Sequence, residues 1–537
     1  MKRFFILAAA SLALLASCGQ QGQVKNSVIK TGPLISNERE TVANTKSGRV
    51  EGYLDDGIYT FKGIPYAKAD RFMPPQDPDP WTDLRQCKIY GPKPRQNGSI
   101  QYDMRPKTDN NFGFQFTFEP QDEKGCLVLN VWTPGLNDAK KRPVFVWFHG
   151  GGYATGSGSD LPCYEGRSLA EKGDIVVVTV NHRLNILGYL DLAGLGGKYA
   201  ESENLGQKDL VKALEWIHEN ITNFGGDPGM VTIGGQSGGG GKVSNMMATP
   251  SAKGLFHHAI VQSGSSLTTG DAEAARQLGL AVVKELGLTP ATIDKINDFT
   301  YEELVAAGSR AQRALSAQGI RGSFGPVLDG KFIVQHPFSP AAPACSKDVP
   351  MLIGTNLNES TYTNDIDIPA DEVKARLVSR MGEERAAEFM TEFDKVYPGK
   401  PAKSKIYTEL SARSRALQQA TVKNAQGGAK AYNYLFTWQS PVNDGALGAC
   451  HGMELPFMFN NIHLQREMTG ATPEAYILAD KVSDAWIAFI KTGDPNTPSL
   501  PKWDAYDPEG GATMIFDNTC EVRHNHDKNL IEINTRQ

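Results

Sequence analysis

The segment Val231-Thr232-Ile233-Gly234-Gly235-Gln236-Ser237-Gly238-Gly239 contains the strongest local signal in the chain. Its first three residues are all β-branched, a residue type enriched in buried strands. The strand is followed at once by the only G-x-S-x-G pattern in the sequence. A serine that projects from a tight turn after a strand must adopt a strained backbone, so its neighbours have to be very small. The segment therefore predicts an exposed, nucleophilic Ser237.

Small residues continue from Ser237 as far as Lys242, and 243–247 has a composition suited to a helix. A glycine-rich turn without chemistry would also be compatible with this stretch. A phosphate-binding loop is a sharper alternative, but Gln236 stands at the first glycine position of that pattern. Val243 replaces the Ser or Thr that would contact magnesium. The residues favour a nucleophile turn over a phosphate site.

A second glycine cluster provides candidate donors for an oxyanion. His149-Gly150-Gly151-Gly152-Tyr153 directly follows the apolar run Val144–Phe148. Lipases and esterases place an HGGG loop after a strand, where glycine backbones approach the substrate closely. We expect the backbone N–H groups of Gly151, Gly152 and Gly238 to form the oxyanion hole.

The chain alternates short β-branched runs with helical patterns. The predicted buried strands are 144–148, 175–180, 231–233, 259–261 and 351–353, and a helix is predicted over 209–220. Strands that alternate with helices indicate a mostly parallel sheet covered on both faces. Regions 267–320 and 365–425 are helical in composition and are interpreted as insertions. The expected fold class is α/β, with one domain over residues 47–537.

Composition excludes some functions and leaves others open. The formal net charge is −5 and no long Lys/Arg run occurs, so nucleic-acid binding has no electrostatic support. No C-x-x-C motif occurs, so a zinc or thioredoxin-type site is not expected. Six cysteines follow Cys18, and sequence alone does not choose among their fifteen full pairings.

The N-terminus has the features of an export signal. Lys2 and Arg3 precede an apolar run, 4–15, that is too short to span a bilayer. Leu15-Ala16-Ser17-Cys18 resembles a bacterial lipobox, which implies cleavage after residue 17 and lipidation of Cys18. The alternative is an ordinary signal peptide that happens to contain a cysteine. We expect residues 1–17 to be a signal peptide and 18–46 a polar tether. The expected location is the bacterial cell envelope, with the membrane face left open.

Together the motifs give the chain a clear resemblance to the type-B carboxylesterase/lipase family, whose fold is the α/β hydrolase and which includes the cholinesterases. The resemblance covers about Gly48 to Phe516. Four further landmarks carry it in order: Phe61-Lys62-Gly63-Ile64-Pro65-Tyr66-Ala67, Leu129-Asn130-Val131-Trp132-Thr133-Pro134, Phe224-Gly225-Gly226-Asp227-Pro228 and Gly254-Leu255-Phe256-His257.

This resemblance places the remaining catalytic residues. The family acid lies at the glutamate of Gly354-Thr355-Asn356-Leu357-Asn358-Glu359, although loop glutamates are commonly just solvated. The base must follow the acid. His451 matches its position in a glycine-flanked loop, whereas His463, His524 and His526 are interpreted as surface residues. The resemblance implies acyl transfer without metal or organic cofactor, and a structural ion pair between Arg183 and Asp209.

Several residues depart from the family pattern. Gln236 replaces the usual Glu before the nucleophile, which removes a negative charge beside the site. Lys124-Gly125 replaces the Glu-Asp before Cys126, which leaves the partner of Arg71 uncertain. Arg95 stands where the family has the cysteine that pairs with Cys126, so a loop disulfide would have to use Cys87.

Two functions follow from these observations. The first is a lipid-anchored serine ester hydrolase that acts on neutral esters of small or medium size. The loop that ends near Cys126 has no tryptophan to hold a quaternary amine, so a cholinesterase role is not supported. The second is a catalytically silent binding protein, as in family members that serve as adhesion receptors. The physiological ester and the oligomeric state remain open.

Overall fold

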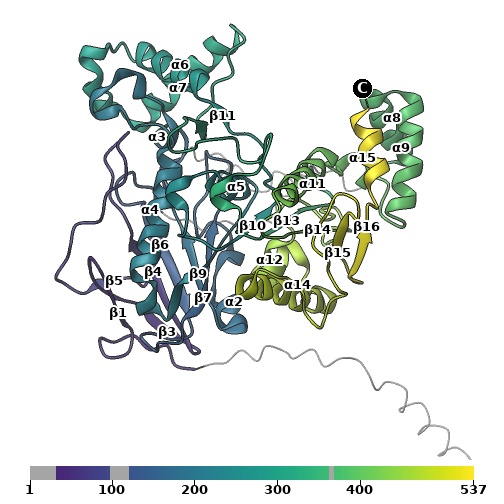
Figure 1. Cartoon of the computed structure of the whole chain (residues 1–537), viewed down its shortest axis with the longest axis horizontal. Helices are drawn as coiled ribbons and strands as arrows, with labels where there is room; N and C mark the ends of the chain where they lie inside the picture. The colour runs from purple at the N-terminus through teal and green to yellow at the C-terminus, as the bar shows by residue number, and fades with distance from the viewer. Residues whose placement is uncertain (1–31, 97–119, 362–367, 537) are drawn as a thin grey trace, which may run out of the picture.

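The computed structural model describes residues 32–96, 120–361 and 368–536. The predicted signal peptide and Cys18 lie outside these residues. Within them, one large sheet of eleven strands runs through the molecule in the order β16-β15-β14-β13-β10-β9-β7-β8-β6-β4-β3 (Figure 1). None of the described helices is both long and apolar enough to cross a bilayer.

The centre of the sheet is parallel and its edges are antiparallel. The parallel strands are β8 (Val176–Val180), β7 (Arg142–Phe148), β9 (Gly226–Gln236), β10 (His258–Gln262), β13 (Met351–Asn356), β14 (Ala431–Phe436) and β15 (Ala512–Phe516). The antiparallel strands are β16 (Glu521–His524), β6 (Val128–Thr133), β4 (Ile58–Pro65) and β3 (Tyr53–Asp55). The mostly parallel sheet predicted from the sequence is confirmed.

Both faces of the sheet are buried because successive side chains of a strand point to opposite sides. On β7, Phe145 and Trp147 join one apolar cluster, whereas Val144 and Val146 join another. The first cluster includes α12 (Leu455–Met458) and α14 (Pro473–Thr492). The second includes α4 (Leu205–Asn220), α5 (Gly238–Met247) and α11 (Leu410–Ala425). This is the layered α/β arrangement expected from alternating strands and helices.

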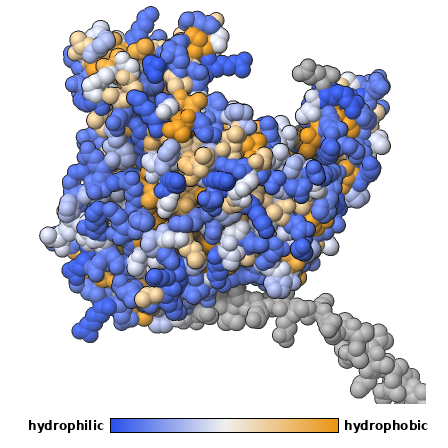
Figure 2. Space-filling model, in the orientation of Figure 1, coloured by the Kyte–Doolittle hydropathy of each residue, from blue (hydrophilic) through white to orange (hydrophobic). Residues whose placement is uncertain are grey.

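The predicted helical insertions form two lobes above the sheet (Figure 1). One contains α6 (Ala272–Glu285) and α7 (Tyr301–Ser316), which share a separate apolar cluster. The other contains α8 (Ala370–Met381), α9 (Glu383–Val396) and the C-terminal α15 (Lys528–Thr535). The surface is hollowed between the lobes (Figure 2), and α5 and α11 lie in the region between them.

The remaining described α-helices and β-strands are short. They are β1 (Val42–Thr45), β2 (Gly48–Glu51), β5 (Arg85–Gln86), β11 (Gly270–Asp271), β12 (Val327–Leu328), α2 (Arg167–Gly173), α3 (Asn185–Tyr189), α10 (Ser404–Tyr407) and α13 (Arg466–Thr469).

The polar tether predicted over 18–46 is too long at its C-terminal end. Strand β1 pairs antiparallel with β2, and Ala43 is completely buried. Farther upstream, Ile35 forms a bridge with Leu54. The folded domain therefore begins before residue 47. A single four-residue strand in a polar segment carries too little apolar periodicity to be recognised.

Helix α5 begins at Gly238, five residues before the predicted start at Val243. Four consecutive glycines have poor helix propensity, which explains the prediction. The packing around the turn requires them: a Cβ atom on Gly239 would lie 2.1 Å from the carbonyl oxygen of Phe148. Tertiary contacts thus outweigh local propensity here.

Candidate active site

Ser237 occupies a strained turn between β9 and α5. Its backbone angles are φ 58° and ψ −126°, outside the main allowed regions for an L-residue. Such a conformation costs on the order of 1–3 kcal/mol and persists only where the surroundings enforce it. Here the Ser237 N–H donates to the Gln262 carbonyl at 2.8 Å, and the Ser237 carbonyl accepts from the Gly241 N–H at 3.1 Å. The predicted strained serine is therefore present.

The glycine loop after β7 lies directly against this turn. Gly151 and Gly152 have φ values of 83° and 64°, the region that favours glycine. A Cβ atom on Gly238 would lie 2.5 Å from the backbone nitrogen of Gly152, so the two backbones meet without side chains between them. The structure thus brings together the three glycines expected to supply oxyanion donors.

A buried lysine forms a hydrogen bond to the start of this loop. The Lys242 ammonium is fully buried and donates a hydrogen bond to the His149 carbonyl at 2.9 Å. Burial lowers the pKa of Lys242 to about 7, and the carboxylate of Asp160 opposes that shift. The sequence interpretation named this lysine only as the end of the small-residue stretch and did not predict its burial. A charged residue directly after four glycines was the available signal.

Glu359 and His451 form a hydrogen-bonded pair. His451 Nδ1 contacts Glu359 Oε2, and Glu359 Oε1 accepts from the Asn356 backbone N–H at 2.8 Å. Glu359 is only 4% exposed, so it is not the solvated loop carboxylate of the alternative interpretation. Burial disfavours the charged imidazole, but the charge and hydrogen bond of Glu359 outweigh it and raise the pKa of His451.

Gln236 links the serine turn to this pair. Its side-chain amide donates to His451 Nε2 at 3.0 Å across 215 positions of sequence. Because Nδ1 faces the carboxylate, Nε2 is the acceptor nitrogen of the ring. Gln236 is 4% exposed and does not point away from the site. The residue that departs from the family pattern therefore touches the nitrogen expected to act as base.

A second buried carboxylate near His451 was not predicted. Glu454 is fully buried and accepts from the side-chain amides of Asn356 at 2.5 Å and Gln262 at 3.1 Å. Burial and the nearby charge of Glu359 raise its pKa to about 7. Its place three residues after His451 was visible, but nothing in the pattern distinguished it from a helix-start carboxylate.

Ser237 opens into a cavity of about 240 Å³. The lining residues are Tyr153, Ser237, Gly238, Gly241, Ser263, Gly264, Ser265, Ser266, Ala412 and Arg415. This volume is below the roughly 300–1,000 Å³ of pockets that enclose drug-sized ligands. The cavity therefore fits a small group beside the serine.

The other three histidines are not part of this cluster. His463 and His524 are exposed, as predicted. The prediction for His526 is wrong: its side chain is only 8% exposed and packs edge-on against Tyr397. Burial lowers its pKa to about 4. Packing of the C-terminal α15 against α9 encloses this segment, a contact that local sequence does not reveal.

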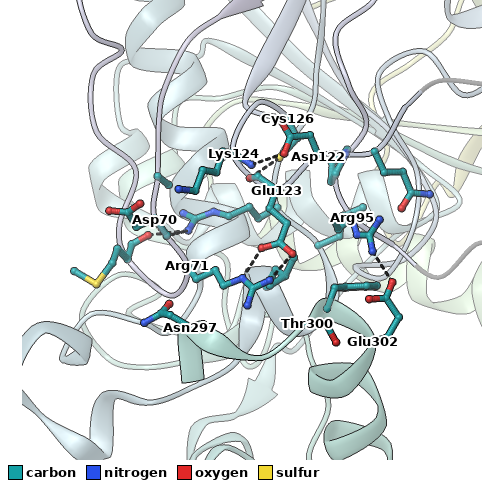
Figure 3. A pocket seen from close by; sticks show the side chains of 18 of the residues that line it. Asp70, Arg71, Arg95, Asp122, Glu123, Lys124, Cys126, Asn297, Thr300 and Glu302 are labelled. Atoms are coloured by element: carbon teal, nitrogen blue, oxygen red, sulfur yellow. Dashed lines mark hydrogen bonds and ion pairs between the residues drawn. The ribbon is translucent and has the colours of Figure 1, made fainter. Parts of the chain in front are cut away.

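The structure confirms the predicted ion pair and identifies a partner for Arg71. Arg183 and Asp209 form a buried pair with a closest distance of 2.6 Å, as expected. Arg71, whose partner was uncertain, makes two hydrogen bonds to Glu123 at 2.5 and 2.7 Å (Figure 3). The carboxylate directly before Lys124 thus replaces the missing Glu-Asp.

Figure 3 also shows a second cavity around this pair, of about 890 Å³. Arg95 and Glu302 form another ion pair on its wall.

The structure contains no disulfide between Cys87 and Cys126. Both are free thiols, buried in the apolar cluster on one face of the sheet.

The chain is similar to known esterases along nearly its whole length. The profile of the Carboxylesterase family matches residues 39–533. Para-nitrobenzyl esterase of Bacillus subtilis (strain 168) is 33% identical over 90% of this chain and 96% of its own length. Phenmedipham hydrolase of Pseudarthrobacter oxydans is also 33% identical, over 90% and 96% respectively.

The solved structure of an esterase from Clostridium hathewayi, described as able to hydrolyse aliphatic aromatic polyesters, superposes with a TM-score of 0.84. The two sequences are 36% identical, and the match covers 94% of this chain and all of the other. This chain belongs to the carboxylesterase family, and it is a carboxylic ester hydrolase with the α/β-hydrolase fold.

Proposed function

We propose that the hydrolysis proceeds through an acyl-enzyme on Ser237, with His451 as general base and Glu359 as its orienting carboxylate. The main support is the hydrogen-bonded chain from Glu359 through His451 to Gln236, the residue next to the strained serine. A serine hydroxyl needs such a base, because it is a weak nucleophile while protonated.

The proposed reaction has two steps. The Gln236 amide must first release His451 Nε2. Nε2 then takes the Ser237 proton as Oγ attacks the ester carbonyl, and it returns that proton to the departing alcohol. Water then attacks the acyl-enzyme with His451 again as base, which releases the acid and restores the serine. Glu359 keeps Nδ1 protonated and stabilises the imidazolium without taking the proton.

Backbone N–H groups of Gly151, Gly152 and Gly238 are proposed to stabilise the oxyanion in both steps. Support comes from the close approach of the Gly152 and Gly238 backbones beside Ser237. Donors fixed in a protein interior stabilise developing charge more than water does, because they do not reorient during the reaction.

Neutral esters with a small or medium group are the proposed substrates. The 240 Å³ cavity limits the group held beside Ser237, and Gln236 contributes no charge there. Reaction with a fluorophosphonate probe tests the serine mechanism: a single adduct on Ser237 and loss of ester turnover are expected. Ester turnover without an adduct on Ser237 would contradict the serine mechanism.

The Gln236→Glu variant is expected to change both charge selectivity and pH dependence. Charges about 6 Å apart interact by roughly 3 kcal/mol at an effective dielectric near 20, before screening by solvent and salt. The ratio of kcat/KM for a cationic ester over its neutral isostere should rise about tenfold. A carboxylate beside Nε2 also favours the imidazolium, so the acid limb of kcat/KM should move to higher pH.

Steady-state assays of both esters at low and high salt provide the measurement. A matched control is Gln318→Glu, which places the same change at an exposed position after α7, outside the cavity lining. An unchanged selectivity ratio in Gln236→Glu would show that position 236 does not govern charge preference.

We further propose that Cys18 carries a lipid anchor and that the mature protein resides in the bacterial cell envelope. The support is the lipobox-like Leu15-Ala16-Ser17-Cys18 after a short apolar run. No membrane-spanning helix is found among the described residues, so attachment would rest on the N-terminus.

The Cys18→Ser variant is expected to lose firm membrane attachment. One acyl chain gives only marginal binding, whereas a lipoprotein cysteine carries several, so native attachment should resist a salt wash. Fractionation compares the two proteins, and Ser17→Ala serves as the neighbouring control that keeps the thiol. Mass spectrometry of the mature N-terminus decides the matter, since an unmodified residue there would contradict the anchor.

A further inference from the structure

One cation faces the cavity that contains Ser237. Ala412 and Arg415 are three residues apart on α11, so they share one face of that helix, and both line the cavity. Among the described residues that line it, Arg415 is the only charged one. The cavity beside the nucleophile therefore carries one positive charge on its wall, which attracts anions.

The guanidinium forms only a long ion pair with Glu409 and no hydrogen bond to it. Arg415 Nη2 lies 3.9 Å from Glu409 Oε1, which is longer than a hydrogen bond. Glu409 instead accepts from the hydroxyls of Ser360 and Ser411, each at 3.1 Å. The Arg415 side chain is 49% exposed, so its fork of N–H donors can be approached from the cavity.

The same cavity contains two buried hydroxyls that lack partners. The Oγ atoms of Ser263 and Ser265 are shielded from solvent and have no hydrogen-bond partner among the described residues. Both residues line the cavity with Arg415. Buried hydroxyls in native proteins are normally paired, and a rotation about Cα–Cβ that turns these hydroxyls toward the cavity would let a ligand oxygen pair with them.

We propose that Arg415 is a specificity-determining residue that binds a free carboxylate on the substrate, and that the preferred esters include half-esters of dicarboxylic acids. A guanidinium can bind a carboxylate through two parallel hydrogen bonds. Ser263 and Ser265 line the same cavity, and their hydroxyls would add donors once they turn toward it. This inference rests on the serine mechanism proposed above and adds anionic half-esters to its neutral substrates.

The test compares esters that differ only in charge. Monomethyl adipate is paired with methyl adipamate, its neutral amide isostere, to place the carboxylate in the acyl part. The second pair, 4-carboxyphenyl butyrate and 4-carbamoylphenyl butyrate, places it in the alcohol part. In Arg415→Met, kcat/KM for the carboxylate member of at least one pair should fall about tenfold, mainly through KM. The amide member should change less than about twofold.

Arg415→Lys keeps the charge but not the fork, so an intermediate loss is expected. Arg49→Met is the matched control: Arg49 is 50% exposed and lies 3.9 Å from Glu38, but it is outside the cavity lining. If the carboxylate-to-amide ratio is unchanged in Arg415→Met for both pairs, the inference is wrong. Failure of the serine mechanism would be distinct, because the fluorophosphonate probe would then leave Ser237 unlabelled and Ser237→Ala would keep its turnover of the neutral members.

Discussion

Replacement of Ser237 by alanine is expected to lower kcat for ester hydrolysis by roughly 10⁴–10⁶-fold. The proposed acyl-enzyme needs an oxygen at this position, and alanine supplies none. Alanine retains the Cβ atom and the backbone contacts to Gln262 and Gly241, so the turn should still form. Oxyanion donors and substrate binding alone would leave a residual rate about 10³–10⁴ above that in water.

The measurement is kcat for a neutral ester, together with fluorophosphonate labelling and thermal unfolding. Loss of turnover and label with an unchanged Tm would separate chemistry from folding. Ser483→Ala is a suitable control, since Ser483 is a buried serine outside the cavity lining that donates to the Ala479 carbonyl and accepts from Lys172. Retention of more than a few per cent of the wild-type kcat in Ser237→Ala would refute the assignment.

The predictions that succeeded rest on short stretches of chain. A strand followed by a glycine-flanked serine, and a strand followed by three glycines, are local patterns with a local steric cause. Burial of both sheet faces can also be recognised locally, because it requires continuous β-branched runs such as Val176–Val180. These features could be predicted because neighbours in sequence create them.

Glu359 and His451 were different, since neither lies in a regular pattern. A carboxylate or histidine in a loop is usually solvated, and only the family resemblance separated these two from the rest. Their pairing spans 92 positions and depends on the parallel strands β13 and β14. The sequence alone does not show that two residues so far apart along the chain lie side by side in the fold.

Buried charges were the main features missed. Lys242 and Glu454 are both enclosed, and charged residues are rarely fully buried without partners. Each is stabilised by groups from distant segments: the His149 carbonyl for Lys242, and Gln262 for Glu454. Periodicity identifies apolar faces but gives no indication that a polar side chain has been enclosed.

Two buried carboxylates near His451 allow a discriminating final prediction. Glu359 bonds His451 Nδ1 directly, whereas the recorded hydrogen bonds of Glu454 come from Asn356 and Gln262. Glu359→Gln is therefore expected to reduce kcat by roughly 10⁴-fold, because an amide can stabilise the wrong imidazole tautomer and cannot balance the imidazolium charge.

Glu454→Gln should reduce kcat by less than about tenfold, since it removes no contact to the ring. Its effect should appear in the pH profile. With a pKa of about 7, Glu454 gains a negative charge as the pH rises through neutrality, and that charge favours protonated His451. In Glu454→Gln the charge is absent, so the acid limb of kcat/KM should shift to lower pH. Profiles of both variants between pH 5 and 9 provide the test, and equal losses of kcat in the two would contradict the assignment of Glu359 as the orienting carboxylate.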